Sequence, residues 1–517
     1  MMRRFLPTTL ILFAAWPGAA LLSAPPPEEW VPVRWEGGPL EAARRAGDKT
    51  PPEPAVHEAL ARWYEPSTLS LLEGSAVNCL LLSLAAGADP AVEMQQRQLV
   101  LRYARLARER GLAVLGVVYP GAGPAQVAAA VSEAGLDGVM LEGEFPDEFR
   151  FRQSLDKALR GAGSKALVLA VSPAGELRKD SVSPVVAVEG VVPGVVQTGD
   201  AAVASATAGL WIDSNIWLAR SLHPAAAGRP IWIRHGYGTG DLAMLLRSIA
   251  DAAAAGGRWI VALPDGLRAG LFRKDDGAVS DWREINAYIS FFERQKQWRE
   301  LPAFGNVAIV LDAAGANLAH SEEYLNLIAR RQIPYRVIER AKLAAGSLEG
   351  LRAVVAFDLA PPSEVERKIL MAFVARGGLL LGGPPWGKPP ADQSYNVLAS
   401  GEGELVVYKD DAPDPEGVAR DMNDLLTTPE LGVSLFDAPA VLSYVSGPAS
   451  GVRLLVQAVN YAGQPAETVT IWVTGKYSSA RLLEPGSPPA VLPLRQSGGR
   501  TEVVLKNLAV YGAVELE

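Results

Sequence analysis

The sequence predicts an α/β protein in which a (β/α)8 TIM barrel precedes a flavodoxin- or amidotransferase-like α/β domain and a C-terminal β-sandwich. Three observations lead to this prediction. Apolar runs alternate with helical stretches over residues 30–301, and the same rhythm restarts at residue 306. From Val441 onward, alternation with period two replaces the helical pattern. The length of 517 residues fits several domains, since one domain usually holds about 100–200 residues.

Eight short apolar runs are the expected strands of the first domain, residues 25–301. They are VPVRW (31–35), NCLLLSL (78–84), AVLGVVY (113–119), GVMLE (138–142), ALVLAVS (166–172), VVAVE (185–189), IWIRH (231–235) and WIVALP (259–264). Helical periodicity separates them, most clearly at 91–111, 124–135 and 241–257. Eight strands fit a barrel, and a doubly wound sheet is the alternative. A further run, GLWID (209–213), is a ninth strand or replaces one of the eight.

The second domain is expected over residues 302–400. Its strands are NVAIVLD (306–312), YRVIER (335–340), LRAVVAFD (351–358) and GLLLGG (378–383), with helices at 321–332 and 362–377. This range contains no cysteine. The thiol chemistry of glutamine amidotransferases is therefore excluded, although the pattern is typical of an amidotransferase-like sandwich.

A connector rich in proline and glycine at 382–393 leads to the last domain, residues 401–517. One helical stretch remains near 415–426. After it, runs with period-two alternation are separated by turn residues, which predicts a β-sandwich.

The first 24 residues are expected to be a signal peptide. Arg3 and Arg4 precede an apolar run, and small residues follow up to Ala24. The mature protein would begin near Pro25 and be secreted or periplasmic, with an uncleaved anchor as the alternative. No other segment is apolar over the roughly 18–20 residues that a membrane span needs.

Composition narrows the possible partners. The chain is 49% hydrophobic and 21% charged, as in globular proteins, and its net charge of -8 offers no basic field for nucleic acid. Cys79 is the only cysteine; it lies in an apolar run and is expected to be a buried hydrophobic residue. The four histidines are too scattered to predict a metal site. No phosphate-loop or dinucleotide motif is present, so no cofactor is expected.

The strand GVMLEGE suggests a site at its end. Successive side chains of a strand face opposite sides, so Met140, Glu142 and Glu144 should share one face, and Val139 and Leu141 the other. If the apolar face meets the helices, both glutamates lie at the carboxyl end of the barrel, where active sites of this fold assemble.

Polar and aromatic residues also stand at the ends of other expected strands. Candidates for binding a substrate are Trp35, Tyr119, Glu189, Trp211, Asn215, Trp232, Arg234, His235 and Asp265. Tryptophan faces can stack on sugar rings, so the composition of these ends favours a carbohydrate over a phosphate group.

Paired carboxylates suit cleavage of a glycosidic bond. One acid protonates the leaving oxygen, while the other attacks the anomeric carbon or activates water. Glu142 and Glu144 lie on the same strand and would approach a sugar from one side. We therefore expect Glu142 or Glu144 to be the general acid and Asp213 to be the second catalytic carboxylate, with Glu189 and Asp265 as alternatives.

The order of domains resembles that of family 42 β-galactosidases and related glycoside hydrolases. The residues that carry the resemblance are 454–486 with 505–517, where VNY (459–461) is expected to pair with VYGAVEL (510–516). GLDGVMLEGEF (135–145) resembles a strand of several barrel glycosidases, including polygalactosaminidase-like proteins. The resemblance implies a carbohydrate substrate and a possible homo-oligomer formed through the α/β domain.

The chain departs from this family at the catalytic positions. The related enzymes carry Asn-Glu after strand four and Glu after strand seven. Here strand four ends in Leu141-Glu142-Gly143-Glu144 and strand seven in Arg234-His235. The sequence thus predicts an exported glycoside hydrolase-like protein, with a non-catalytic carbohydrate-binding or surface-assembly protein as the alternative.

Overall fold

The computed structural model describes residues 23–48, 51–172, 183–198, 201–203, 210–312, 315, 318–359 and 361–517. The expected signal peptide, residues 1–24, lies almost wholly outside the described residues.

All eight strands expected in the first domain are present. A six-stranded sheet has the order β13 (Val261–Ala262), β1 (Pro32–Arg34), β2 (Cys79–Ala85), β3 (Ala113–Val118), β4 (Gly138–Leu141) and β5 (Leu167–Ala170). A three-stranded sheet has the order β12 (Arg258–Trp259), β11 (Ile231–Arg234) and β6 (Val186–Glu189). Every neighbouring pair in both sheets is parallel.

The two sheets are linked at both edges. Ser172, just after β5, forms a parallel bridge with Val188 of β6. At the other edge, Ile260 alone separates β12 from β13, so residues 258–262 pair with β11 at one end and with β1 at the other. Strand pairing therefore follows the chain from β1 to β11 and returns to β1 through residues 258–262.

Helices separate these strands. They are α1 (Gly38–Ala46), α2 (Pro54–Arg62), α3 (Pro90–Arg108), α4 (Pro124–Ala134), α5 (Glu148–Gly161), α7 (Ile216–Ala226), α8 (Leu242–Ala254), α9 (Asp265–Arg273) and α10 (Asp276–Arg294). Local chemistry sets their ends. Asp89 caps α3 by accepting a hydrogen bond from the Ala91 backbone, and Gly135 ends α4 in a left-handed conformation.

The strands have two apolar faces, and each packs against a different cluster. Met140, Leu115 and Trp232 belong to one buried cluster with Tyr119. Val139 and Leu141 belong to the cluster that contains the helices. The predicted alternation along β4 is thus confirmed up to Leu141.

The run GLWID is not a member of either parallel sheet. It contributes β10 (Ile212–Asp213), which pairs antiparallel with β7 (Gly194–Val195). A second short pair nearby joins β8 (Gln197–Thr198) to β9 (Ala201–Ala202).

The second α/β unit has a six-stranded sheet. Its order is β15 (Tyr335–Glu339), β14 (Val307–Leu311), β16 (Ala353–Val355), β17 (Leu379–Gly382), β19 (Gly403–Tyr408) and β18 (Tyr395–Ser400), and only β18 is antiparallel to its neighbour. Its helices are α11 (Leu318–Arg330), α12 (Glu364–Ala375), α13 (Pro415–Leu425) and α14 (Thr428–Leu431). The sheet continues past residue 400, the expected boundary, because β19 pairs with β17.

Two antiparallel sheets complete the chain. One has the order β20 (Val433–Phe436), β23 (Ala466–Thr474), β27 (Arg500–Leu508) and β26 (Arg495–Ser497). The other has the order β21 (Val441–Ser446), β22 (Leu454–Asn460), β28 (Tyr511–Leu516), β24 (Ala480–Leu483) and β25 (Ala490–Val491). Both sheets contribute to one buried cluster. The expected pairing of residues 459–461 with the last strand is present, since Val459 faces Tyr511.

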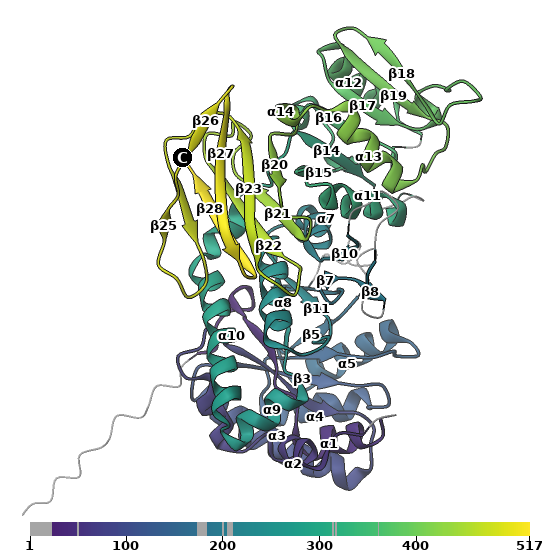
Figure 1. Cartoon of the computed structure of the whole chain (residues 1–517). Helices are drawn as coiled ribbons and strands as arrows, with labels where there is room; N and C mark the ends of the chain where they lie inside the picture. The colour runs from purple at the N-terminus through teal and green to yellow at the C-terminus, as the bar shows by residue number, and fades with distance from the viewer. Residues whose placement is uncertain are drawn as a thin grey trace, which may run out of the picture.

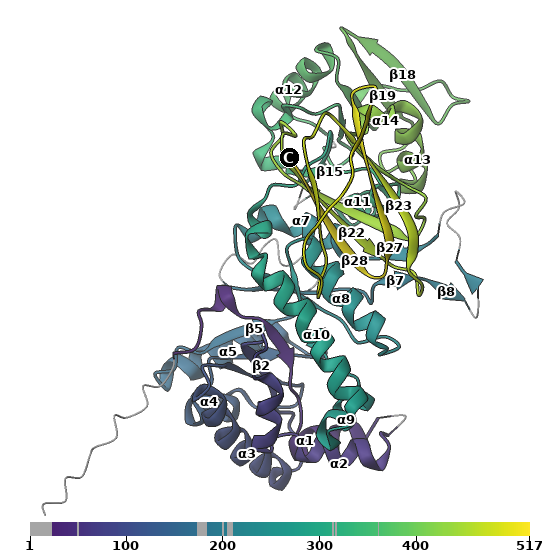
Figure 2. The same ribbon diagram turned by 60° about the vertical axis from the view of Figure 1, so that its left-hand side comes forward.

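Figure 1 shows the parallel strands at the bottom of the molecule, with the second α/β unit and the antiparallel sheets side by side above them. The long helix α10 runs upward from the parallel strands and lies beside the antiparallel sheets in both Figure 1 and Figure 2. Phe292 of α10 contacts Tyr511 of β28, with ring centroids 4.8 Å apart. Among the described residues, no helix is long and apolar enough for a membrane span.

Candidate functional site

Charged and aromatic side chains meet where five parallel strands reach their carboxyl ends. The residues at these ends are Arg34 (β1), Tyr119 (just after β3), Glu142 (just after β4), Glu189 (β6) and Arg234 (β11). Since parallel strands end at the same edge of a sheet, residues far apart in the sequence come together here.

Glu142 is at the centre of this group. Its Oε1 accepts hydrogen bonds from Nη2 of Arg34 at 2.8 Å and from Nη2 of Arg234 at 2.6 Å. The Glu142 side chain is 8% exposed. Arg234 also donates through Nη1 to Oε1 of Glu189 at 2.7 Å. Because hydrogen bonds between ionised groups are short and strong, residues of β1 and β11 fix the position of the Glu142 carboxylate.

A second carboxylate, Glu36, shares Arg34 with Glu142. Arg34 donates to Glu36 through Nε and Nη2, both at 3.0 Å, and the Tyr119 hydroxyl donates to Glu36 Oε1 at 2.9 Å. Oε1 of Glu36 and Oε1 of Glu142 both lie within 3.0 Å of Arg34 Nη2, so they are no more than about 6 Å apart. The structure thus brings two carboxylates together, with a guanidinium group between them.

Burial and charge pairing shift the pKa values of Glu36 and Arg34 in opposite directions. Burial alone would raise the pKa of Glu36, but Arg34 outweighs it and the pKa is lowered. Burial alone would lower the pKa of Arg34, but Glu36 and Glu142 raise it well above its ordinary value. Burial, aided by Glu36 and Glu41, raises the pKa of Tyr119 well above its ordinary value. The Tyr119 hydroxyl therefore stays protonated and donates to Glu36.

Glu41 of α1 completes the cluster. It accepts hydrogen bonds from Nε of Arg44 at 3.0 Å and from Nη2 at 2.8 Å, and the Arg44 guanidinium lies 4.7 Å from the centroid of the Tyr119 ring. The cluster then holds the carboxylates Glu36, Glu41, Glu142 and Glu189 and the guanidinium groups Arg34, Arg44 and Arg234. Its charges nearly balance.

His235 follows Arg234 and lies next to the cluster. Its ring stacks on Trp259, with centroids 5.1 Å apart and planes at 13°. Nδ1 lies 2.6 Å from the Gly236 carbonyl oxygen, and Nε2 is buried without a partner among the described residues. Burial, helped by Arg234, lowers the pKa of His235 to about 4. The imidazole is therefore neutral at pH 7, donates from Nδ1 and leaves a bare acceptor at Nε2.

Glu144 does not join Glu142. The strand ends at Leu141, and Gly143 has a φ of 99°, a conformation that favours glycine. Strand alternation therefore stops before Glu144, which is exposed and forms no hydrogen bond with any residue in the described ranges. The expectation that Glu142 and Glu144 share one face was wrong for this reason.

Two predicted aromatic residues are buried away from the carboxylates. Trp35 packs between Trp63 and Trp282, at centroid distances of 4.9 and 6.1 Å, and its Nε1 donates to the Tyr103 hydroxyl. It lies on the helix-facing side of β1. Trp232 lies inside the strand cluster and is also buried. Neither side chain offers a surface on which a sugar could stack.

Asp213 and Trp211 lie beside the second α/β unit. Asp213 ends the antiparallel strand β10, and the Arg330 guanidinium of α11 lies 3.7 Å from the centroid of the Trp211 ring. No hydrogen bond or ion pair in the described ranges joins Asp213 to Glu142. The structure therefore does not place Asp213 beside Glu142 as the second carboxylate.

Asn215 and Asp265 have structural partners. Asn215 donates through Nδ2 to the buried Asp251 carboxylate at 2.7 Å and to the Val191 carbonyl at 2.8 Å. Asp265, at the start of α9, accepts from Nη2 of Arg45 at 2.5 Å. Asn215 thus joins the start of α7 to α8, and Asp265 joins α9 to α1.

Sequence reasoning missed Arg34, Glu36, Glu41 and Arg44. A signal for two of them was available. In VPVRWEG, Val31, Val33 and Trp35 alternate with Arg34 and Glu36, so the parity rule applied to GVMLEGE would have placed Arg34 and Glu36 on the opposite face.

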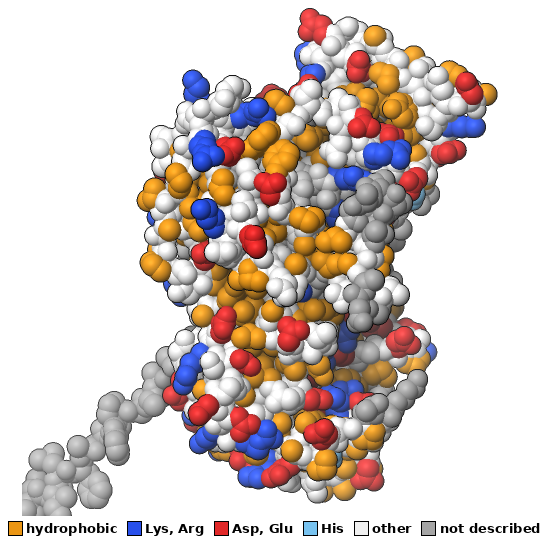
Figure 3. Space-filling view, viewed as in Figure 1, with side chains coloured by type: hydrophobic (Ala, Val, Ile, Leu, Met, Phe, Trp, Pro, Cys, Tyr) orange, Lys and Arg blue, Asp and Glu red, His pale blue; other side chains and the backbone are white. Residues whose placement is uncertain are grey.

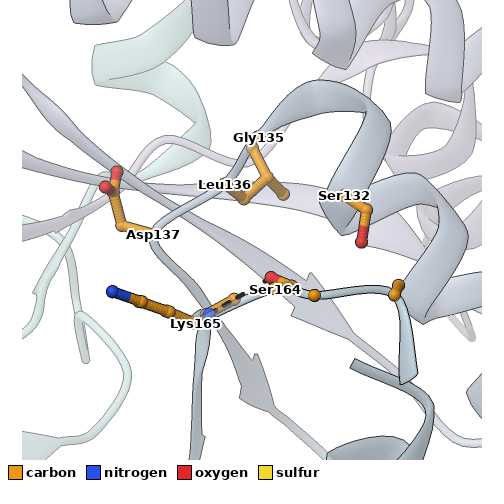
Figure 4. Close-up of a pocket in the computed structure, with 9 residues that line it drawn as sticks. Ser132, Gly135, Leu136, Asp137, Ser164 and Lys165 are labelled. Carbon is orange, nitrogen blue, oxygen red and sulfur yellow. Dashed lines mark hydrogen bonds between the residues drawn. The ribbon is translucent and has the colours of Figure 1, made fainter. Parts of the chain in front are cut away.

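Another hollow, of about 320 Å³, lies at the opposite ends of β4 and β5. Figure 4 shows Asp137 and Lys165 with Ser132 and Ser164 around it. The Asp137 carboxylate accepts a hydrogen bond from the Val114 backbone at 2.8 Å, which ties the start of β4 to β3. This carboxylate has a structural role.

Neither metal ligands among the described residues nor a charged patch on the face drawn in Figure 3 defines a site. Across the residues described, no group of three His, Cys, Asp or Glu could hold a metal ion. Acidic and basic side chains are interspersed over the face shown in Figure 3.

No family model matches the chain, and no curated protein matches its sequence. Similar solved structures exist. Alpha-L-fucosidase isoenzyme 2 from Paenibacillus thiaminolyticus is 11% identical, over 88% of this chain and 96% of its own, with a TM-score of 0.56. The fold is glycoside hydrolase-like. At 11% identity, the similarity shows a shared fold and says nothing about activity or substrate.

Two further structures have lower TM-scores. The exo-beta-1,4-mannosidase Op5Man5 from Opitutaceae bacterium strain TAV5 is 12% identical, over 79% of this chain and 96% of its own, with a TM-score of 0.46. A GH42 beta-galactosidase from G. stearothermophilus is 9% identical, over 83% of this chain and 67% of its own, with a TM-score of 0.33. The similarity to the fucosidase confirms the expected likeness to glycoside hydrolases for the fold, while the family 42 layout stays a prediction.

Proposed function

We propose that this protein is an exported glycoside hydrolase-like protein that acts on a carbohydrate at the carboxyl ends of its parallel strands. The proposal includes closure of the two parallel sheets into a (β/α)8 barrel, which is supported by the Ser172–Val188 bridge and by residues 258–262, which pair at both edges. Export is proposed from Arg3, Arg4 and the apolar run that follows them.

The observation that carries the proposal is the placement of Glu142. Both arginines bind its Oε1, whereas Oε2 accepts no hydrogen bond from the residues that the structure describes. That oxygen is the one a ligand can use. Two guanidinium groups fix the Glu142 carboxylate through Oε1, so it suits attack on an anomeric carbon, or stabilisation of the charge there.

Glu144 is the proposed general acid, because the left-handed Gly143 takes it off the strand face of Glu142 and the two carboxylates need not approach a sugar from the same side. It follows Glu142 by two residues, is exposed, and has no arginine partner in the described ranges. A residue that must release and regain a proton works best without a fixed counter-ion.

A second candidate function is carbohydrate binding without hydrolysis. Glu36, Glu41, Glu142 and Glu189 all have arginine partners, and Asp213 lies outside the cluster. A site in which all four clustered carboxylates are neutralised fits recognition of sugar hydroxyls as well as catalysis.

The deciding experiment is hydrolysis of aryl α-L-fucosides, β-D-galactosides and β-D-mannosides, together with binding of the corresponding oligosaccharides. We expect Glu142→Gln and Glu144→Gln to lower kcat by about 10²–10⁴-fold while binding persists. Glu133→Gln, on the exposed face of α4, is the control and should change nothing.

Binding without turnover in the wild type would select the second function. A protein that neither binds nor cleaves any carbohydrate in these panels would overturn both.

A further inference from the structure

A pocket lies where three parts of the chain meet, apart from the Glu142 cluster. Its volume is about 370 Å³. It is lined by Leu210, just before β10, and by residues in or next to α11, α13 and β20, and Figure 1 shows α11 above β10 where the upper and lower parts of the molecule meet. The residues that the argument uses are Arg330, Arg331, Gln332, Glu416, Phe436 and Asp437.

Arg330 is a buried cation that donates no hydrogen bond to any described residue. Its side chain is 6% exposed, yet Nε, Nη1 and Nη2 all lack a partner. Oε1 of Glu323 forms an ion pair with Nη2 at 3.9 Å, a distance too long for a hydrogen bond. One face of the guanidinium is covered by Trp211. A buried guanidinium without hydrogen-bond acceptors is costly, so an acceptor that entered the pocket and bonded to Arg330 would remove that cost.

The other charges that face the pocket already have partners. Arg331 donates to Oε1 of Glu416 at 2.8 Å. The exposed Asp437 accepts from the Thr470 hydroxyl at 3.1 Å. Burial lowers the pKa of Arg330, opposed by Glu323, Glu416 and Asp213, but an arginine stays a cation at neutral pH. The pocket lining therefore holds two guanidinium groups and two carboxylates, and Arg330 is the cation whose nitrogens have no hydrogen-bond acceptor among the described residues.

Gln332 adds an acceptor beside this donor. Its backbone is left-handed, with a φ of 60°, and its Nε2 donates to the Val441 carbonyl oxygen. That bond fixes the amide, and Oε1 is left buried with no partner among the described residues. Phe436, which is 36% exposed, and Leu435 give the pocket an apolar wall.

We propose that this pocket binds a sugar acid, the carboxylate on Arg330 and a hydroxyl group on Gln332. A guanidinium fork matches the two oxygens of a carboxylate. A sugar hydroxyl can donate to Oε1 of Gln332, which is an acceptor without a partner among the described residues. The apolar face of the sugar ring packs on Phe436. The site is independent of the proposed glycosidase chemistry, since none of its residues belongs to the Glu142 cluster.

The test is calorimetric titration of the full-length protein with D-glucuronate, with D-glucose as the neutral control. We expect D-glucuronate to bind and D-glucose to bind at least about tenfold more weakly. Arg330→Met should raise the Kd for D-glucuronate by about tenfold or more. This variant should fold, because Arg330 donates no hydrogen bond that would be lost and the unbranched methionine side chain can still pack on Trp211.

Two controls locate the binding. Arg367→Met removes another arginine that stacks on a tryptophan, Trp386 at 4.8 Å, in the same α/β unit, and should keep the wild-type Kd. Glu142→Gln should keep it as well. If D-glucuronate does not bind the wild type, or binds Arg330→Met as tightly, the proposal is wrong. Loss of binding in Glu142→Gln alone would place the ligand at the strand ends and also overturn it.

Discussion

At the scale of single residues, arginine and glutamate form compact clusters at both ends of the parallel strands. Opposite the Glu142 cluster, Glu293 accepts hydrogen bonds from Nε of Arg258 at 3.0 Å and from Nη2 of Arg299 at 2.6 Å. These three residues line a cavity of about 650 Å³ at the amino ends of β1, β11 and β12. Since Arg258 begins β12 and Glu293 lies in the last turn of α10, this cluster joins β12 to α10.

We predict that Glu293 makes stability fall in acid. Burial alone would raise its pKa, but Arg258 and Arg299 lower it to about 2. The folded pKa lies below that of the unfolded chain, so the contribution is present at neutral pH and is lost as pH falls from about 4.5 through 2. Its size is on the order of 3 kcal/mol.

Urea unfolding at several pH values checks this. Glu293→Gln should be less stable than the wild type at pH 7, and the difference should shrink between pH 4.5 and pH 2. Glu467→Gln, an exposed residue of β23, serves as the control and should follow the wild type throughout. A difference that does not depend on pH would refute the assignment.

The candidate site could be predicted in part, residue by residue. Alternation along GVMLEGE placed Glu142 correctly, because β4 is a regular strand up to Leu141. Alternation says nothing about where a strand ends, so Glu144 was misplaced. It also cannot say which sheet a short run joins, and Asp213 was paired with Glu142 although β10 belongs to a separate antiparallel pair. Arg34 was overlooked although the same rule covers it.

At the scale of elements, the strands were predictable because they are buried on both faces and therefore read as apolar runs. The run WIVALP became two short strands, β12 and β13, which pair with different neighbours. β18 and β19 were missed, since they follow a loop rich in proline and glycine that suggested a domain boundary. β19 belongs to the second sheet because it pairs with β17, and a local sequence pattern cannot show such a pairing.

Close packing around β4 gives a prediction at this scale. A Cβ added to Gly138 would lie 2.8 Å from the Leu167 carbonyl oxygen, which is backbone of β5 and cannot move away easily. Gly138→Ala should therefore lower the free energy of unfolding by about 1–3 kcal/mol. Gly161, at the end of α5, has no atom within 4 Å of the added Cβ. Gly161→Ala should raise it by about 0.5–1 kcal/mol. Urea unfolding of both variants measures the two changes in the free energy of unfolding, which should have opposite signs. Changes of the same sign and size would contradict this account.

At the scale of the whole molecule, the first unit and the terminal sheets share a core. One buried cluster contains Leu246 and Phe292 of the first unit together with Tyr444, Val459 and Tyr511 of the antiparallel sheet. Figure 2 shows α8 and α10 against that sheet. Polar contacts cross the same boundary. The hydroxyl group of Tyr461, just after β22, donates to the buried Asp251 carboxylate of α8 at 2.6 Å, and Gln457 of β22 donates to the Ala254 carbonyl at 2.9 Å. A shared core of this kind makes the two units stabilise each other.

Tyr511 tests this coupling. Its ring contacts Phe291 and Phe292 at 5.9 and 4.8 Å, and its hydroxyl donates to Oε1 of Gln457 at 2.6 Å. Tyr511→Ala should lower the free energy of unfolding by about 3–5 kcal/mol. Because the ring lies between β28 and α10, hydrogen exchange should become faster in α10 as well as in β28.

Trp472→Ala is the matched control, since this half-buried aromatic of β23 contacts Phe436 within the terminal unit, at 4.5 Å. Its effect on exchange should stay in β20, β23 and β27, whose residues contact Trp472, and leave α10 unchanged. Faster exchange confined to the terminal sheets in Tyr511→Ala would mean that the two units are stable independently. Faster exchange in both β28 and α10 would mean that the terminal sheets maintain the helix that packs behind the strands of the site.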